Sequence, residues 1–123
     1  MKRTGRNGTA PALGLLAVAL AAAPAAAQTA PDDTVRRQAV ALFEQGLAAF
    51  QAADFPAARD AFQQSLTLRF NATVLYNLAT TERALHDYPA AVASFRRYLE
   101  TQDDRVTTAE RAEIEASLAD MEA

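Results

Sequence analysis

Apolar residues follow a helical spacing along most of the chain. From Val35 to Met121 they recur every three or four positions, and no segment alternates apolar and polar residues for long. This spacing gathers apolar side chains on one side of a helix, whereas a half-buried strand needs alternation. The pattern therefore predicts an all-α fold. It has five short antiparallel helices, at about residues 34–52, 56–68, 72–85, 89–101 and 107–122.

Polar residues at the predicted helix starts support these boundaries. Two acidic residues precede Thr34, which suits the N-cap of the first helix, and Asn71 suits the N-cap of the third. Thr107 and Glu110 have the spacing of a capping box, in which each side chain satisfies the other residue's backbone N–H. The last helix is therefore predicted to begin close to Thr107.

One stretch of the chain occurs twice. The string Asp-Phe-Pro-Ala-Ala at residues 54–58 returns as Asp-Tyr-Pro-Ala-Ala at residues 87–91, thirty-three residues later. A Phe and then a Leu follow both strings at the same offsets (Phe62 and Leu66; Phe95 and Leu99). A fixed period of this size is typical of stacked repeats. Two helical hairpins of similar build are therefore expected to stack on each other.

This repeat resembles the tetratricopeptide repeat family, whose helix-turn-helix unit has about 34 residues. On this resemblance residues 34–123 form one short solenoid, with repeat one at about 39–71, repeat two at about 72–104 and a capping helix at about 107–122. Five positions depart from the family pattern. Ala53 and His86 stand where the family usually has Gly, and Tyr98 stands where it has a small residue. Phe70 and Asp103 stand where a unit often ends with Pro. Tyr98 implies that the last helix does not pack like the first helix of a third unit.

The resemblance also assigns packing roles. Small residues are expected to let the helices approach closely, and large ones to fill the space between units. The residues assigned to this packing are Gly46, Ala58, Phe62, Leu66, Ala79, Ala91, Phe95 and Leu99. The matched pattern specifies architecture more than function, because the family binds many unrelated partners.

Residues 1–27 have the three regions of a secretory signal. Three cations precede an apolar run at residues 12–23, and three Ala residues follow Pro24. Cleavage is predicted before Gln28, leaving a short polar leader at residues 28–33 and a periplasmic or secreted protein. A permanent anchor is the alternative, but a bilayer span takes about 20 apolar residues. No Cys follows the run, which excludes a lipid-modified cysteine.

The charge and the lack of Cys exclude several partners. Cleavage would leave nine Arg against fifteen acidic residues, a net charge of −6. Nucleic acid and anionic lipid both need a basic surface, so neither is an expected partner. Without Cys the exported chain gains no disulfide, so helix packing has to stabilise it. No stable membrane anchor is expected once the signal is removed.

Side chains able to carry catalysis do not converge in the sequence. His86 is the one histidine, and it suits a helix C-terminus without any further role. The acidic residues of the last helix are expected on its solvated side, and the serines have no base beside them (Glu110, Glu113, Glu115 and Glu122; Ser65, Ser94 and Ser117). No enzyme activity, cofactor or metal is predicted.

A partner surface is predicted on the first helix of each unit. The resemblance implies that these helices line a concave groove, and the first helix is too apolar for a helix with one buried side. The predicted partner-binding residues are Val40, Phe43, Leu47, Phe50, Tyr76, Asn77, Thr80 and Arg83. The first four could equally be core.

Three functions follow from this surface. The preferred one is a non-catalytic interaction module that binds a protein or peptide of the cell envelope. In the alternative, the chain self-associates through its first helix. An enzyme or small-ligand carrier is the weakest, since no convergent polar pocket is evident.

Overall fold

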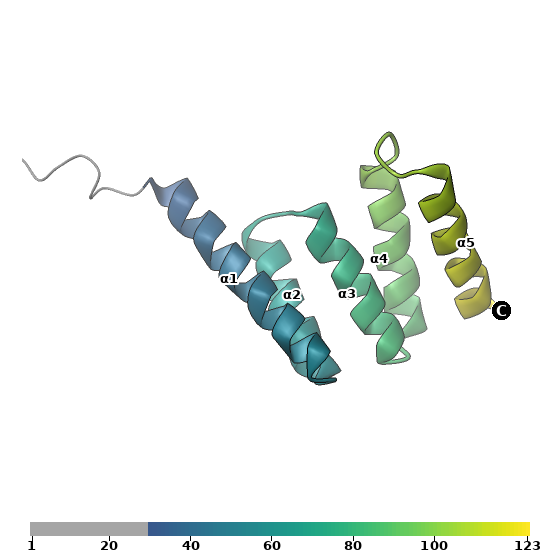
Figure 1. The fold of residues 1–123 in the computed structure, drawn as a ribbon, viewed down its shortest axis with the longest axis horizontal. Coiled ribbons are helices and arrows are strands. Elements are labelled where there is room, and N and C mark those ends of the chain that lie inside the picture. The colour runs from purple at the N-terminus through teal and green to yellow at the C-terminus, as the bar shows by residue number, and fades with distance from the viewer. Residues whose placement is uncertain (1–29) are drawn as a thin grey trace, which may run out of the picture.

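The structure is a computed structural model that describes residues 30–123. The predicted signal and cleavage site, and residues 28 and 29 of the predicted leader, lie outside the described residues. Five helices make up the described part, and it contains no strand, so the all-α prediction is confirmed (Figure 1). They are α1 (Pro31–Gln51), α2 (Phe55–Leu68), α3 (Ala72–Ala84), α4 (Tyr88–Thr101) and α5 (Thr108–Glu122).

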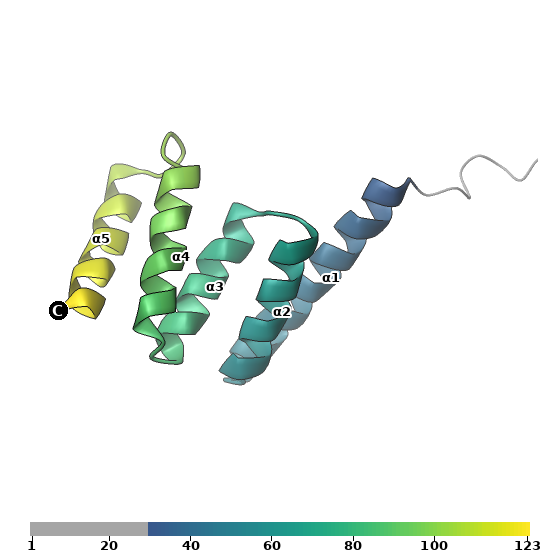
Figure 2. The ribbon, with the colours of Figure 1, turned by 180° about the vertical axis from the view of Figure 1, so that it is seen from behind.

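The helices form a row in which each packs against the next. α1 pairs with α2 and α3 pairs with α4 as antiparallel hairpins, α2 packs on α3, and α5 packs on α4. Both views show the hairpins stacked side by side, with α5 at one end (Figures 1 and 2). α1 is the longest helix, with 21 residues against 13 in α3. Its first turns extend beyond the stack (Figure 1).

The turn of the first hairpin is a helix-ending Schellman motif. The N–H of Ala53 donates to Phe50 O and the N–H of Asp54 to Ala49 O, both at 2.9 Å. Ala53 has a φ of 59°, the left-handed conformation that glycine adopts without cost. The carboxylate of Asp54 then accepts from the N–H of Ala57 at 3.3 Å and starts α2. One short segment thus ends one helix and begins the next.

The second hairpin repeats this turn thirty-three residues later. His86 has the same φ of 59°, and its N–H donates to Arg83 O. The N–H of Asp87 donates to Glu82 O, and its carboxylate accepts from the N–H of Ala90. The repeated string therefore corresponds to a repeated backbone geometry. His86 occupies the left-handed position of this turn, with its ring against Tyr88.

Two predicted helix starts are confirmed and one is wrong. The Asn71 side chain caps α3, and Thr107 and Glu110 form the full capping box of α5. α1 begins at Pro31, with Ala30 in the N-cap position, so Thr34 is not the cap. Pro lacks the N–H that a first turn leaves unpaired, and the two following Asp residues complement the helix dipole. The last residues of the predicted leader thus belong to α1.

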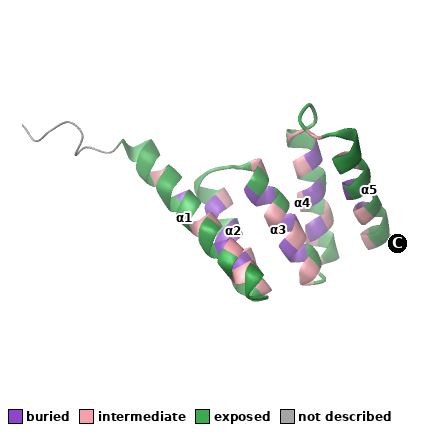
Figure 3. Cartoon of the chain, in the orientation of Figure 1, coloured by how far each residue is buried: buried purple, intermediate pink, exposed green. Residues whose placement is uncertain are grey.

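Two apolar clusters stabilise the stack: one joins α3 to α1 and α2, and the other joins α3 to α4 and α5. Figure 3 shows the buried positions along α3 and α4. Phe62 is central to the first and Phe95 to the second, and both are buried. Their partners also correspond, because the ring of Phe43 lies 5.9 Å from Phe62 and that of Tyr76 lies 5.8 Å from Phe95. The residues assigned to packing lie in this core. Gly46, Ala58, Phe62, Ala79, Ala91, Phe95 and Leu99 are buried, and Leu66 is half-buried.

Candidate functional site

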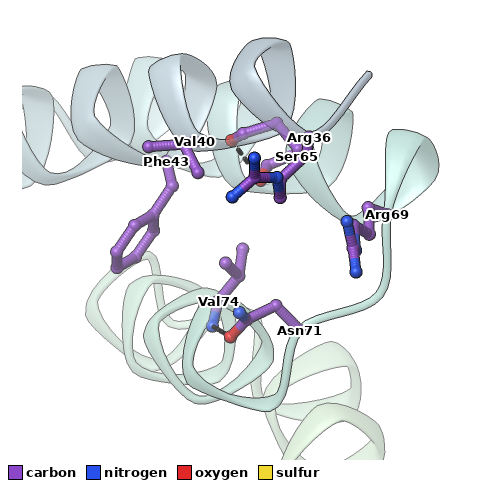
Figure 4. A pocket seen from close by; sticks show the side chains of 8 residues that line it. Arg36, Val40, Phe43, Ser65, Arg69, Asn71 and Val74 are labelled. Carbon is purple, nitrogen blue, oxygen red and sulfur yellow. Dashed lines mark hydrogen bonds between the residues drawn. The ribbon is translucent and has the colours of Figure 1, made fainter. Parts of the chain in front are cut away.

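A hollow between α1 and the start of α3 is the first candidate site (Figure 4). Its volume is about 250 Å³. Val40 and Phe43 come from α1 and Val74 from α3, and Arg36 and Arg69 supply positive charge. The full lining is Arg36, Ala39, Val40, Phe43, Ser65, Arg69, Asn71 and Val74. We call this hollow the first pocket.

Two polar groups in the lining of the first pocket, the Ser65 hydroxyl and the Asn71 side-chain oxygen, already have partners. The hydroxyl of Ser65 donates to Ala39 O at 2.7 Å, which ties α2 to α1. The side chain of Asn71 accepts from the N–H groups of Thr73 and Val74, and Figure 4 draws the bond from Val74. The floor therefore presents apolar surface to a ligand, and Val40, which is part of this surface, is 49% exposed.

Two arginines lie at one side of the first pocket, away from Phe43 (Figure 4). Arg36 donates to Asp33 at 3.0 Å, and both side chains are more than half exposed. Such a surface pair contributes about 0–1 kcal/mol, so Arg36 can exchange Asp33 for a carboxylate of a ligand. Among the described residues, no hydrogen bond or ion pair holds the guanidinium of Arg69. The first pocket therefore combines an apolar floor with available positive charge.

A second hollow, of about 280 Å³, lies between α3 and α5. We call it the second pocket, and its lining is Thr73, Tyr76, Tyr98, Glu110, Glu113 and Ile114. Thr73 and Tyr76 stand thirty-three residues after Val40 and Phe43, so α3 lines the second pocket with the positions that α1 uses in the first. The two hollows are thus successive intervals of one repeated face.

Acidic and aromatic side chains give the second pocket its character. Hydrogen bonds from the backbone N–H and the hydroxyl of Thr107 lower the pKa of Glu110, which keeps this carboxylate charged. Burial raises the pKa of Tyr98, and the nearby Glu110 adds to this shift. Tyr98 is therefore a neutral hydroxyl, and its ring centroid lies 5.3 Å from that of Tyr76.

The predicted partner-binding residues of α1 fall into two groups. Val40 and Phe43 line the first pocket, although Phe43 also packs on Phe62. Leu47 packs against the first apolar cluster, as does Phe50, whose ring meets Phe55 edge to face at 5.2 Å. Leu47 and Phe50 are therefore half-buried supports of the hairpin and line neither pocket.

Three of the predicted partner-binding residues of α3 line hollows that residues of α5 also line. Tyr76 lines the second pocket and is 41% exposed. Thr80 and Arg83 line an adjoining hollow of about 220 Å³, where Arg83 donates to the hydroxyl of Ser117 at 3.1 Å. Asn77 is half-buried, and its side chain donates to Thr73 O on its own helix.

Several lining residues were not predicted from the sequence. Arg69 lies on the connection between α2 and α3, whereas the prediction considered helix faces alone. Glu110 and Glu113 are exposed, as expected for a solvated side of the last helix, but they also line the second pocket, which was not predicted. Thr73 is different, because the sequence places it on the same groove-lining face of the third helix as Tyr76, and it lines the second pocket.

One buried acidic residue lies away from both pockets. Glu82 is 4% exposed, and its Oε1 accepts from the hydroxyl of Ser94 at 2.5 Å. Burial raises the pKa of Glu82 and Asp87 adds to this, while the Ser94 bond and Arg59 act against it. Neither Glu82 nor Ser94 lines the hollows described above. This pair therefore joins α3 to α4 as a packing contact.

Residues 30–123 contain neither a metal-ligating cluster nor a membrane-spanning helix. No group of three or more His, Cys, Asp or Glu side chains in this part is arranged to hold a metal ion. No helix in the same part combines the length and the apolar character needed to cross a bilayer.

Comparison with known proteins identified no relative of this chain. No family model matches it, no curated protein matches it, and no solved structure matches it. The tetratricopeptide resemblance therefore stays a prediction from the sequence pattern.

Proposed function

We propose that the chain is a non-catalytic interaction module of the tetratricopeptide type, which binds a segment of another protein along α1 and α3. The first pocket carries this proposal. Val40 is half exposed there, beside Phe43 and Val74, and the Ser65 hydroxyl is already bonded inside the hairpin. An apolar side chain of a ligand would gain burial in this pocket without breaking that bond.

The repeated build of the two pockets supports an extended ligand. They are lined by corresponding positions of α1 and α3, so one segment could cross both intervals. The signal-like residues 1–27 support export, and the partner would then be a protein of the cell envelope. Recognition by a groove between helices is a recurring mode of peptide binding.

The lining of the first pocket supports binding over chemistry. Ser65 is its one hydroxyl, and that hydroxyl donates to Ala39 O inside the hairpin. A nucleophile would need a base within hydrogen-bond reach on the pocket surface. The charged groups there are the guanidinium groups of Arg36 and Arg69, which do not act as bases at neutral pH.

Crosslinking in intact cells, followed by capture through a C-terminal tag, tests the proposal. Val40→Asp puts a charge on the apolar floor, and the exposure of Val40 protects the fold from the change. Ala41→Asp is the matched control, because Ala41 is exposed on the same helix and lines neither pocket. Tyr76→Ala tests the second pocket. Val40→Asp should lose the crosslinked partner and Ala41→Asp should keep it. Equal recovery of the partner from both variants would refute the assignment of the first pocket as the binding site.

Self-association is the alternative function, and one observation favours it. Leu42 and Leu68 line a hollow of about 300 Å³ at the α1–α2 end of the stack, where Leu68 is 40% exposed. Leu42 is half-buried, whereas Leu75, the corresponding residue of the second repeat, is fully buried. A second copy could complete the burial of Leu42. Light scattering that finds a monomer at tens of micromolar, on the order of normal working concentrations, would exclude this alternative.

A further inference from the structure

We infer that the bound segment has a fixed order of charge, with an acidic residue at the first pocket and a basic residue at the second. This inference rests on the proposed function and deepens it. Apolar side chains of the segment would lie between the two charges, over Val74 and Tyr76 of α3. The partner is thus a peptide segment of another protein with opposite charges at its two ends.

The first pocket fits an acidic residue. Its two charged lining residues are Arg36 and Arg69, from different elements of the fold. Arg69 makes no ion pair among the described residues, and the pairing of Arg36 with Asp33 is exposed and exchangeable. Guanidinium groups bind carboxylates with two parallel hydrogen bonds, which gives direction as well as attraction.

The second pocket fits a basic residue. Its charged lining residues are Glu110 and Glu113, and neither forms an ion pair within residues 30–123. The rings of Tyr76 and Tyr98 lie beside these carboxylates, and a cation is attracted to an aromatic face. Arg83, the nearest cation on α3, donates to Ser117 in the adjoining hollow and does not neutralise either acidic residue. An ammonium or guanidinium group therefore meets both negative charge and aromatic surface here.

The positions of the pockets set the spacing of the two charges. α3 lies between them, and helices in direct contact are about 8–10 Å apart. α1 and α3 both pack against α2, and α3 and α5 both pack against α4. The distance from α1 to α3, and that from α3 to α5, is therefore at least this large. An extended peptide advances about 3.3 Å per residue. The two charges should therefore be separated by at least about three residues.

Selection from a phage-displayed random peptide library, against the purified chain held by a C-terminal tag, tests the inference. Enriched peptides should carry an acidic and a basic residue on opposite sides of an apolar residue, in one order along the peptide. In binding assays with one selected peptide, Arg69→Glu and Glu113→Lys should each weaken binding about tenfold, since each replaces an attraction with a repulsion. The loss should shrink as salt is raised.

Matched variants and exchanged peptides separate charge recognition from damage to the fold. Arg37→Glu reverses a charge on α1 next to Arg36, and Glu115→Lys reverses one on α5, the helix of Glu113. These side chains line neither pocket, so binding should stay within about twofold. A peptide whose acidic residue is changed to Lys should bind Arg69→Glu better than the unchanged chain. A variant that had merely lost structure would not show this reversal.

The outcomes distinguish this inference from the function beneath it. Enriched peptides that share an apolar residue but no charge order would overturn the inference and leave the interaction module standing. Enrichment of no peptide would overturn both. Binding of a peptide that matches a segment of this chain, with a dimer in sedimentation, would replace the foreign partner with a second copy and overturn the inference.

Discussion

Gly46 is the position where one added methyl group should be felt most strongly. It is buried in α1 at the crossing with α2, and a Cβ there would lie 2.5 Å from Cε1 and 2.6 Å from Cδ1 of Phe62. These distances are far below the 3.5–4.0 Å optimum for carbon atoms, so Gly46→Ala forces a shift. The ring of Phe62 is fully buried and packs against Phe43, which leaves little room for movement.

Two opposing contributions decide the size of the effect. Replacing Gly by Ala inside a helix stabilises it by about 1 kcal/mol. Overpacking a core costs about 1–3 kcal/mol, and the confined ring places this site toward the upper end. Gly46→Ala should therefore lower the free energy of unfolding by about 1–2 kcal/mol in net terms. Ala79, the corresponding residue of the second repeat, already has a Cβ, so the restriction comes from the position of the Phe62 ring.

Urea unfolding followed by circular dichroism measures this effect. Ala48→Gly is the matched control, since Ala48 is exposed in the same helix and its change isolates the propensity contribution. Phe62→Leu, combined with Gly46→Ala in a double-mutant cycle, should show a coupling energy above about 0.5 kcal/mol. A Gly46→Ala protein as stable as the original, or more stable, would refute the close-contact reasoning.

Three further changes follow from the turns, the buried acidic residue and the last cap. Ala53→Gly should stabilise the fold by about 1 kcal/mol in urea unfolding, because Gly relieves a left-handed φ; an unchanged midpoint would contradict this. Burial raises the pKa of Glu82 above 4.5, so its stabilising contribution is full below that pH and is lost as pH rises through the native pKa. Glu82→Gln should remove this pH-dependent loss of stability. Identical pH profiles of the free energy of unfolding for the two proteins would contradict the raised pKa of Glu82. Thr107→Ala should weaken the start of α5 by about 1 kcal/mol, seen as faster hydrogen exchange there and not in α2.

Much of the fold was predictable because local chemistry and the repeat agree. Asn71 and Thr107 start helices where their side chains can cap them, as the sequence predicts. The start of α1 was missed because Thr34 is also a good cap, and the non-helical backbone of Ala30, with φ −57° and ψ 143°, decides between the two. A residue suited to the N-cap indicates where a helix can begin, and the backbone conformation determines which of several such residues is used.

The candidate site was less predictable, because it depends on distances between elements. Val40 and Tyr76 could be placed on one face from helical spacing. Arg69 could not, since it enters the first pocket from a connection whose course depends on how α2 ends. Spacing alone also could not separate Phe50 from Val40, because the contact between Phe50 and Phe55 depends on the angle of the turn.

α3 contributes residues to both apolar clusters, and this determines the order in which the helices should unfold. Val74 and Leu78 pack in the first cluster, and Ala79 packs in the second. Unfolding of the helices at one end of the stack can leave the apolar cluster at the other end intact, but unfolding of α3 removes packed residues from both clusters. Hydrogen exchange should therefore be slowest in α3. α3 also lines both pockets. A peptide bound in one pocket should therefore stabilise α3 and, through it, the other pocket.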